Sequence, residues 1–126
     1  MIKTAKILKN KKMHELSIII DLIELCEENA KKNKAEQVDE IIIKIGKLSG
    51  VEAHYLQSAF EFYHVTSDIC KNAKLTINIQ PVIVFCNDCN QNSELKDNNF
   101  KCQKCGSRNL KAIDGEDMYL MQIIMH

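Results

Sequence analysis

The sequence lacks an apolar run long enough for a membrane span, and it lacks an apolar signal segment. Its formal net charge is zero, with 17 basic and 17 acidic side chains, so it has no basic excess for binding nucleic-acid phosphates. It also has no glycine-rich phosphate loop and no nucleophile beside a placed base. These absences favour a cytoplasmic protein that is not an enzyme, with no membrane partner and no nucleic-acid partner.

Four of the six cysteines fall in two closely spaced pairs, which are Cys86 with Cys89 and Cys102 with Cys105. A gap of two residues lets each pair offer two thiolates to one ion, and the spacer between the pairs can fold back as a hairpin. Asn90 and Gly106 follow the pairs and tolerate the left-handed backbone that such turns need. The pattern predicts a closed zinc site, and the alternatives are two local disulfides or a chance clustering.

The predicted zinc site has four sulfur ligands and therefore no open position at which a water could bind. Its expected role is to fold a short polar segment, since structural zinc contributes on the order of 10–16 kcal/mol in small modules. We therefore expect Zn²⁺ to be structural, and the functional residues to lie elsewhere in the chain.

Apolar periodicity predicts two helices and three strands. Helical spacing covers 14–33 and 51–65, whereas alternation or continuous apolar runs indicate strands at 38–48, 73–85 and 118–125. The final strand is apolar on both faces, so we expect it to pair inside the sheet of the preceding elements. The expected fold is α+β, with a three-stranded sheet, two helices on one of its faces and an inserted zinc-ribbon lobe.

This arrangement divides the chain into three parts. Residues 1–12 carry five lysines and no acid, and we expect a disordered basic leader that lies upstream of the true start if translation begins at Met13. Residues 13–85 and 112–126 form the α/β domain, and residues 86–111 form the four-cysteine zinc lobe. The lobe is thus expected to be inserted between two strands of one sheet.

The other cysteines and histidines receive structural interpretations. Cys26 falls on the apolar side of the first helix and is expected to be a core thiol, while Cys70 is expected to be structural or incidental. His54 and His64 are expected at the surface of the second helix, and His126 at an exposed terminus.

Met13-His14-Glu15-Leu16-Ser17, combined with the four cysteines, resembles the HypA/HybF family of nickel metallochaperones in hydrogenase maturation. The resemblance covers residues 13 to about 125. It implies that Ni²⁺ is the transported ion and that a [NiFe]-hydrogenase large-subunit precursor receives it. A HypB-type GTPase is the implied partner, and because some relatives also serve urease, urease maturation proteins are further implied partners.

The resemblance also implies a nickel site at the start of the matched region. A chain beginning at Met13 offers its α-amine, the deprotonated amide of His14 and the His14 imidazole in one plane, which suits nickel. The fourth donor is the Glu15 amide or a carboxylate, for which Glu52 is the candidate. Family members begin at this methionine, whereas twelve residues precede it here. We therefore expect translation from Met13, because an internal Met13 has no free amine.

The main alternative function is a zinc-ribbon adaptor that binds nucleic acid or a protein assembly. It depends on a modest basic group in the zinc lobe, formed by Lys96, Lys101, Lys104, Arg108 and Lys111. Rubredoxin-like electron transfer by a four-cysteine iron site is a further alternative, which a colourless purified protein would exclude.

Overall fold

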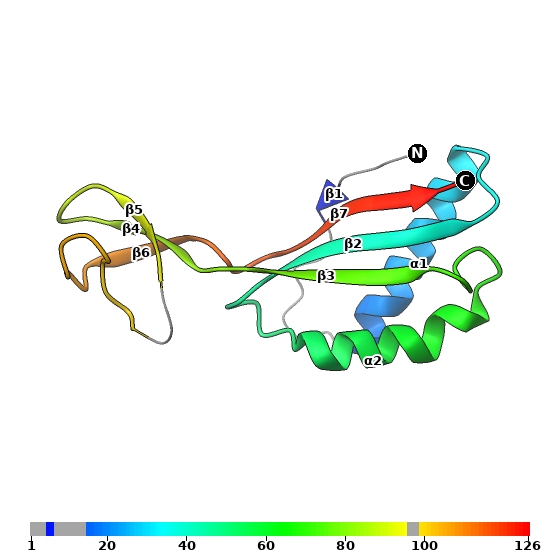
Figure 1. Ribbon diagram of the computed structural model, residues 1–126, viewed down its shortest axis with the longest axis horizontal. Coiled ribbons are helices and arrows are strands. Elements are labelled where there is room, and N and C mark those ends of the chain that lie inside the picture. The colour runs from blue at the N-terminus through cyan, green and yellow to red at the C-terminus, as the bar shows by residue number, and fades with distance from the viewer. Residues whose placement is uncertain (1–4, 7–14, 96–98) are drawn as a thin grey trace.

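The computed structural model describes residues 5–6, 15–95 and 99–126 of the chain. A larger sheet with two helices on one face occupies one end of an elongated molecule, and a smaller sheet occupies the other end (Figure 1). The elements in chain order are β1 (Ala5–Lys6), α1 (Glu15–Lys32), β2 (Val38–Gly46), α2 (Ala53–Tyr63), the 3₁₀ helix η1 (His64–Thr66), β3 (Lys74–Gln80), β4 (Ile83–Cys86), β5 (Asn92–Glu94), β6 (Leu110–Asp114) and β7 (Met118–Met125).

The larger sheet has the strand order β1-β7-β2-β3. β2 pairs with β3 in parallel and with β7 antiparallel, so the last strand of the chain lies inside the sheet as predicted. The α+β fold class is confirmed, but the sheet has one strand more than expected. Ala5 and Lys6, from the segment expected to be a disordered leader, pair with Leu120 and Tyr119 of β7.

The two helices cover the sheet because each has one continuous apolar side. α1 carries Glu15 in its first turn and two lysines in its last turn, as the helix dipole favours, and it buries Ile19, Leu22 and Cys26. α1 ends where Lys34 takes a left-handed φ of 56° and the Ala35 amide donates to the Ala30 carbonyl at 2.8 Å. No helix among residues 15–95 and 99–126 is long and apolar enough to cross a membrane.

The strand predicted over 73–85 is two strands in the structure, and the prediction of one continuous strand is wrong. Pairing with β2 stops at Gln80, opposite Gly46, and the next residue is the only proline of the chain. Proline has no N–H to continue a ladder, so the backbone leaves the larger sheet here. β4 then begins at Ile83 in the smaller sheet, whose order is β5-β4-β6.

A narrow neck joins the two sheets, at the place where residues 46–48, 81–82 and 115–117 meet. Two glycines determine how these segments pack. The Gly46 amide donates to the Asp117 carbonyl at 2.7 Å, and the Leu48 amide donates to the Gly115 carbonyl at 2.7 Å. A Cβ atom added at Gly46 would overlap the Gly115 carbonyl, and one added at Gly115 would lie 2.9 Å from the Pro81 oxygen. Three backbone segments therefore meet at van der Waals distance in the neck.

The smaller sheet extends past both ends of the predicted zinc lobe. β4 starts at Ile83 and β6 ends at Asp114, whereas the lobe was predicted to span 86–111. The division of the chain into 13–85 with 112–126, and 86–111, stays a prediction. We use "lobe" below for residues 83–114, which include all three strands of the smaller sheet.

Candidate metal centre

Two tight turns place the four cysteines of the lobe. Cys86 ends β4, and the Asn90 amide donates back to its carbonyl at 2.8 Å; the Gly106 amide donates to the Cys102 carbonyl at 2.9 Å. Asn90 has φ of 56° and Gly106 has φ of 77°, so both take the left-handed backbone predicted for them. The two turns therefore have the same construction and face each other across the lobe.

The four cysteine sulfurs form one cluster, in which all Sγ atoms lie within 4.8 Å of one another. The distance is 3.5 Å between Cys86 and Cys105 and 3.7 Å between Cys89 and Cys102. A tetrahedral zinc with Zn–S bonds of about 2.3 Å requires S···S distances of about 3.8 Å, whereas a disulfide requires about 2 Å. All four cysteines are free, so the geometry excludes two local disulfides and fits one four-sulfur metal ion.

Backbone amides favour a thiolate at Cys102. The amides of Cys105 and Lys104 donate to its Sγ, each at 3.4 Å, and they lower the pKa of the Cys102 thiol to about 6. The amide of Cys89 likewise lowers the pKa of Cys86. At Cys105 the Ser107 amide is the largest single influence and lowers the pKa, but the hydrogen bond with Cys86, burial, and the hydrogen bonds with Cys102 and Cys89 together raise that pKa to about 12. Part of the cluster is therefore anionic near neutral pH before a cation binds.

The lobe has little apolar interior to hold it together. Of its described apolar side chains outside the cluster, only Val84 is fully buried. Polar pairs link the two turns instead: Ser107 donates to Asp88, the Asn87 amide donates to Asn109 at 3.1 Å, and Lys104 donates to Gln91 at 2.7 Å. Exposed pairs of this kind contribute little stability. We therefore expect a bound ion to supply most of the stability of the lobe.

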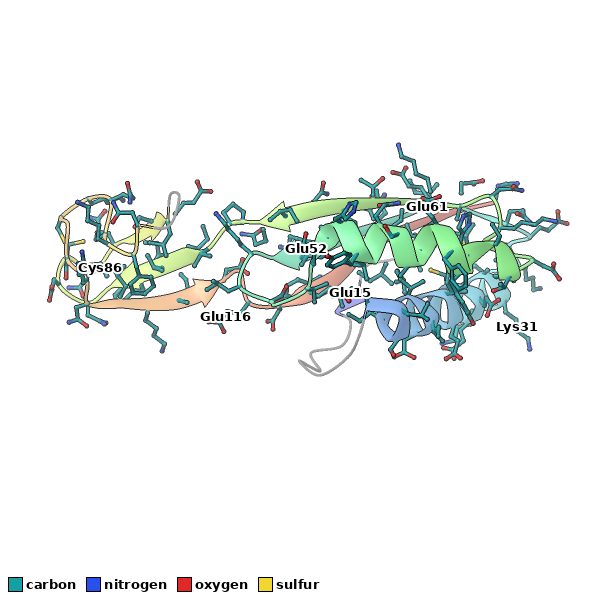
Figure 2. All side chains as sticks on the ribbon, turned by 90° about the horizontal axis from the view of Figure 1, so that it is seen from below. Glu15, Lys31, Glu52, Glu61, Cys86 and Glu116 are labelled. Atoms are coloured by element: carbon teal, nitrogen blue, oxygen red, sulfur yellow. The ribbon has the colours of Figure 1, made fainter. Side chains whose placement is uncertain are left out.

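The predicted nickel ligands are only partly covered by the structure. Met13 and His14 lie outside the described residues. Glu15 opens α1 and is half-buried, whereas Glu52 is the exposed N-cap residue of α2 and makes no capping hydrogen bond with that helix. Figure 2 shows Glu15 and Glu52 at the same end of the helical layer, the end nearer the neck, while Lys31 lies at the far end.

His64 is buried, and its predicted place at the surface is wrong. Its ring stacks on Phe60 with the centroids 4.6 Å apart, and its Nδ1 lies 2.9 Å from the Cys70 carbonyl oxygen. The sequence contained the signal, since His64 follows Phe60 by one helical turn on the apolar side of α2. His54 and His126 are exposed as predicted, and His126 pairs with Asp39 at 2.8 Å.

We expect His64→Ala to lower the free energy of unfolding by about 2–3 kcal/mol, because it removes a stacked ring and leaves the Cys70 carbonyl with one partner fewer. His54→Ala, on the exposed side of the same helix, is the matched control and should change it by less than about 0.5 kcal/mol. Urea unfolding of both variants measures the difference. Equal effects would contradict the structural role of His64.

Comparisons with known proteins agree over most of the chain. The family model described as "Hydrogenase/urease nickel incorporation, metallochaperone, hypA" matches residues 13–125. The hydrogenase maturation factor HypA of Campylobacter jejuni is 53% identical over 113 residues, covering 90% of this chain and 99% of the relative. The HypA factor of Aquifex aeolicus is 38% identical over 111 residues, covering 88% of this chain and 96% of the relative.

Two solved structures share the fold. The solution structure of the Ni metallochaperone HypA from Helicobacter pylori has a TM-score of 0.63 at 36% identity, and the match covers 90% of this chain and 97% of that one. A second solution structure, of a HypA protein, has a TM-score of 0.68 at 35% identity and covers 91% and 98% of the two chains. Both matches include the larger sheet and the lobe, since they extend over nearly the whole chain.

Proposed function

Because the chain belongs to the HypA family of nickel metallochaperones for hydrogenase maturation, we propose that it binds Ni²⁺ through Met13 and His14, with Glu15 or Glu52 as the further donor, and passes it to a [NiFe]-hydrogenase precursor. The observation that carries this proposal is the extent of the family match. It begins at Met13 and ends at residue 125, so it includes both the Met13-His14-Glu15 segment and the four cysteines.

The ion held by Cys86, Cys89, Cys102 and Cys105 is proposed to be Zn²⁺ with a structural role. Four thiolates at these distances suit zinc, which has no geometric preference beyond the tetrahedron that they form. With every position filled by sulfur, the ion cannot activate water, which supports a protein without catalytic activity of its own. The nickel cargo then needs a separate site.

Local donors suit a cargo ion that must be released. The Met13 amine and the His14 amide and imidazole close fused five- and six-membered chelate rings in a plane, the geometry that Ni²⁺ prefers. The fourth donor is the Glu15 amide or the Glu52 carboxylate. Support for Glu52 comes from its exposed position at the same end of the helical layer as Glu15 and from its lack of a capping bond (Figure 2).

The decisive experiment compares nickel binding by a chain beginning at Met13 with binding by the 126-residue chain, using calorimetry at two pH values. The shorter chain should bind one nickel more tightly, because a peptide nitrogen cannot replace an amine without losing a far less acidic proton. Its affinity should rise with pH through the range of an α-amine, whose pKa is about 8, because the proton competes with nickel below that value.

Single substitutions test the proposed nickel ligands one at a time. His14→Ala should abolish specific binding by the shorter chain, while His54→Ala, an exposed histidine outside the proposed site, should leave it unchanged. Glu52→Ala should weaken binding a few-fold, and Glu61→Ala, exposed on the same helix, is its control. Equal affinities of the two chain lengths, with the same dependence on His14, would show that the Met13 amine is not a ligand.

The remaining assignments follow the family's role in a maturation pathway. We propose that a HypB-type GTPase and a hydrogenase large-subunit precursor are the partners, that urease maturation proteins are a second set, and that the protein acts in the cytoplasm. A pull-down with tagged full-length protein, with and without nickel, tests the partners. The nucleic-acid adaptor is set aside, because the family match explains the ribbon and the helical domain together.

A further inference from the structure

Two buried thiols lie in contact outside the four-cysteine cluster. Cys26 is on α1 and Cys70 lies between η1 and β3, and both side chains are 0% exposed in the core beneath the helices. The two thiols are close enough that each shifts the pKa of the other, and both are free. Neither takes part in the metal sites described above, so the pair has no assigned role.

A polar network fixes this contact independently of the sulfurs. The Ser67 hydroxyl donates to the Glu27 carboxylate at 2.7 Å, which ties the turn after η1 to the residue next to Cys26. The Cys70 amide donates to the same hydroxyl at 3.2 Å. His64 Nδ1 holds the Cys70 carbonyl at 2.9 Å. The turn that carries Cys70 is therefore held against α1 at the position of Cys26.

A surface hollow lies directly beside the pair. It has a volume of about 500 Å³ and is lined by Glu24, Glu27, Glu28, Lys31, Ala35 and Ile69. Glu27 is the neighbour of Cys26 in the chain and Ile69 is the neighbour of Cys70, so the hollow lies over the two segments that carry the thiols. Three glutamates against one lysine make the hollow acidic, which disfavours anionic oxidants and admits small neutral ones.

We propose that Cys26 and Cys70 are a redox pair that closes a reversible disulfide between α1 and the turn before β3 when hydrogen peroxide is the oxidant. The Cys70 thiolate attacks one peroxide oxygen and becomes a sulfenic acid, while the O–O bond breaks and the other oxygen leaves as water after taking a proton. The Cys26 sulfur then attacks Cys70 and expels a second water. Two thiols lose two electrons and two protons, and one peroxide becomes two waters.

The order of attack follows from the hydrogen bond within the pair. Because Cys26 donates to it, the pKa of the Cys70 thiol is lowered, whereas the same bond and burial raise the pKa of Cys26. A thiol with the lower pKa is the better initial nucleophile, and the second thiol resolves the sulfenic acid.

Peptide mapping of the zinc-loaded full-length protein tests the proposal. After brief treatment with a small excess of hydrogen peroxide, free thiols are blocked by alkylation and the protein is digested without reduction. The expected product is a peptide pair linked through Cys26 and Cys70 that disappears with dithiothreitol. Oxidised glutathione carries a net negative charge, so it should form this linked peptide pair at least tenfold more slowly than hydrogen peroxide does. The oxidised protein should unfold at a temperature about 5–10 °C higher, because the link constrains the unfolded chain.

Cys70→Ala and Cys26→Ala are the variants, and both should lose the rise in unfolding temperature on oxidation. Because alanine at a buried site can itself destabilise the fold, the wild-type peptide map decides the matter without them. The proposal is overturned if both thiols stay reduced while the lobe cysteines oxidise, if they reach sulfinic acid without a link, or if Cys26 or Cys70 links to a lobe cysteine instead.

Discussion

Replacing Cys102 with serine is expected to remove zinc from the protein and unfold the lobe, while the larger sheet and its helices stay folded. Cys102 is buried, and its sulfur accepts two backbone amides that favour the thiolate form, which serine does not offer. The loss is large because a structural zinc supplies on the order of 10–16 kcal/mol to a module of this size. Elemental analysis and amide NMR spectra of the purified variant measure both effects.

The matched control for this experiment is Lys104→Ala. Lys104 is exposed in the same turn and its side chain donates to Gln91, while its amide, which survives the substitution, makes the contact to Cys102. This variant should keep one zinc per chain. Full zinc occupancy in Cys102→Ser would show that the four sulfurs are not the ligand set, and unfolding of the larger sheet as well would show that the two parts are not separable.

Replacing Gly46 with alanine is expected to lower the free energy of unfolding by about 3 kcal/mol, a large effect for a single methyl group. The added Cβ would overlap the Gly115 carbonyl and lie 2.7 Å from the Glu116 amide nitrogen. Both obstacles are backbone, so no side-chain rotation relieves them. The neck has to open, with loss of the hydrogen bonds from Gly46 to Asp117 and from Leu48 to Gly115.

Gly50→Ala provides the comparison, because Gly50 has a left-handed φ of 80° and open space around it. This substitution should lower the free energy of unfolding by only about 1 kcal/mol, the cost of a left-handed backbone at a residue with a Cβ atom. Thermal unfolding of the two variants at equal zinc content separates crowding in the neck from glycine's general flexibility. A Gly46→Ala protein no less stable than Gly50→Ala would mean that the three segments are not packed as described.

The sequence predicts the elements of this fold better than their ends. β7 matches its predicted range because its residues are apolar on both faces, which only a central strand requires. The break between β3 and β4 was missed, because apolar residues resume at Val82 directly after Gln80 and Pro81, and Pro81 was interpreted as an edge or bulge within one strand. β1 was missed because two residues in a lysine-rich stretch carry no strand period.

The sequence likewise predicts some features of the candidate site and misses others. The spacing of the four cysteines predicts both the sulfur cluster and its geometry, since each pair forms a tight turn and the turns need residues such as Asn90 and Gly106. Contacts between segments far apart in the chain produce no such pattern in the sequence. Neither the meeting of Cys26 with Cys70 nor the bond from Ser67 to Glu27 follows from a local pattern, because each depends on how α1 lies against the turn after η1.

The insertion of the lobe between β3 and β7 also affects the order in which the protein folds. β7 is the last strand to be synthesised, yet it pairs with β2 along most of its length, for example Ile123 with Ile41. In a chain without metal, all the residues from Gln80 to Met118 form a flexible loop that must close before this pairing. A zinc ion held by the four cysteines would gather most of that loop into a folded unit whose two ends meet at the neck. Shortening the flexible part about fourfold lowers the closure entropy cost by roughly 1 kcal/mol. We therefore expect a metal ion in the lobe, which would touch no residue of the larger sheet, to speed the formation of that sheet.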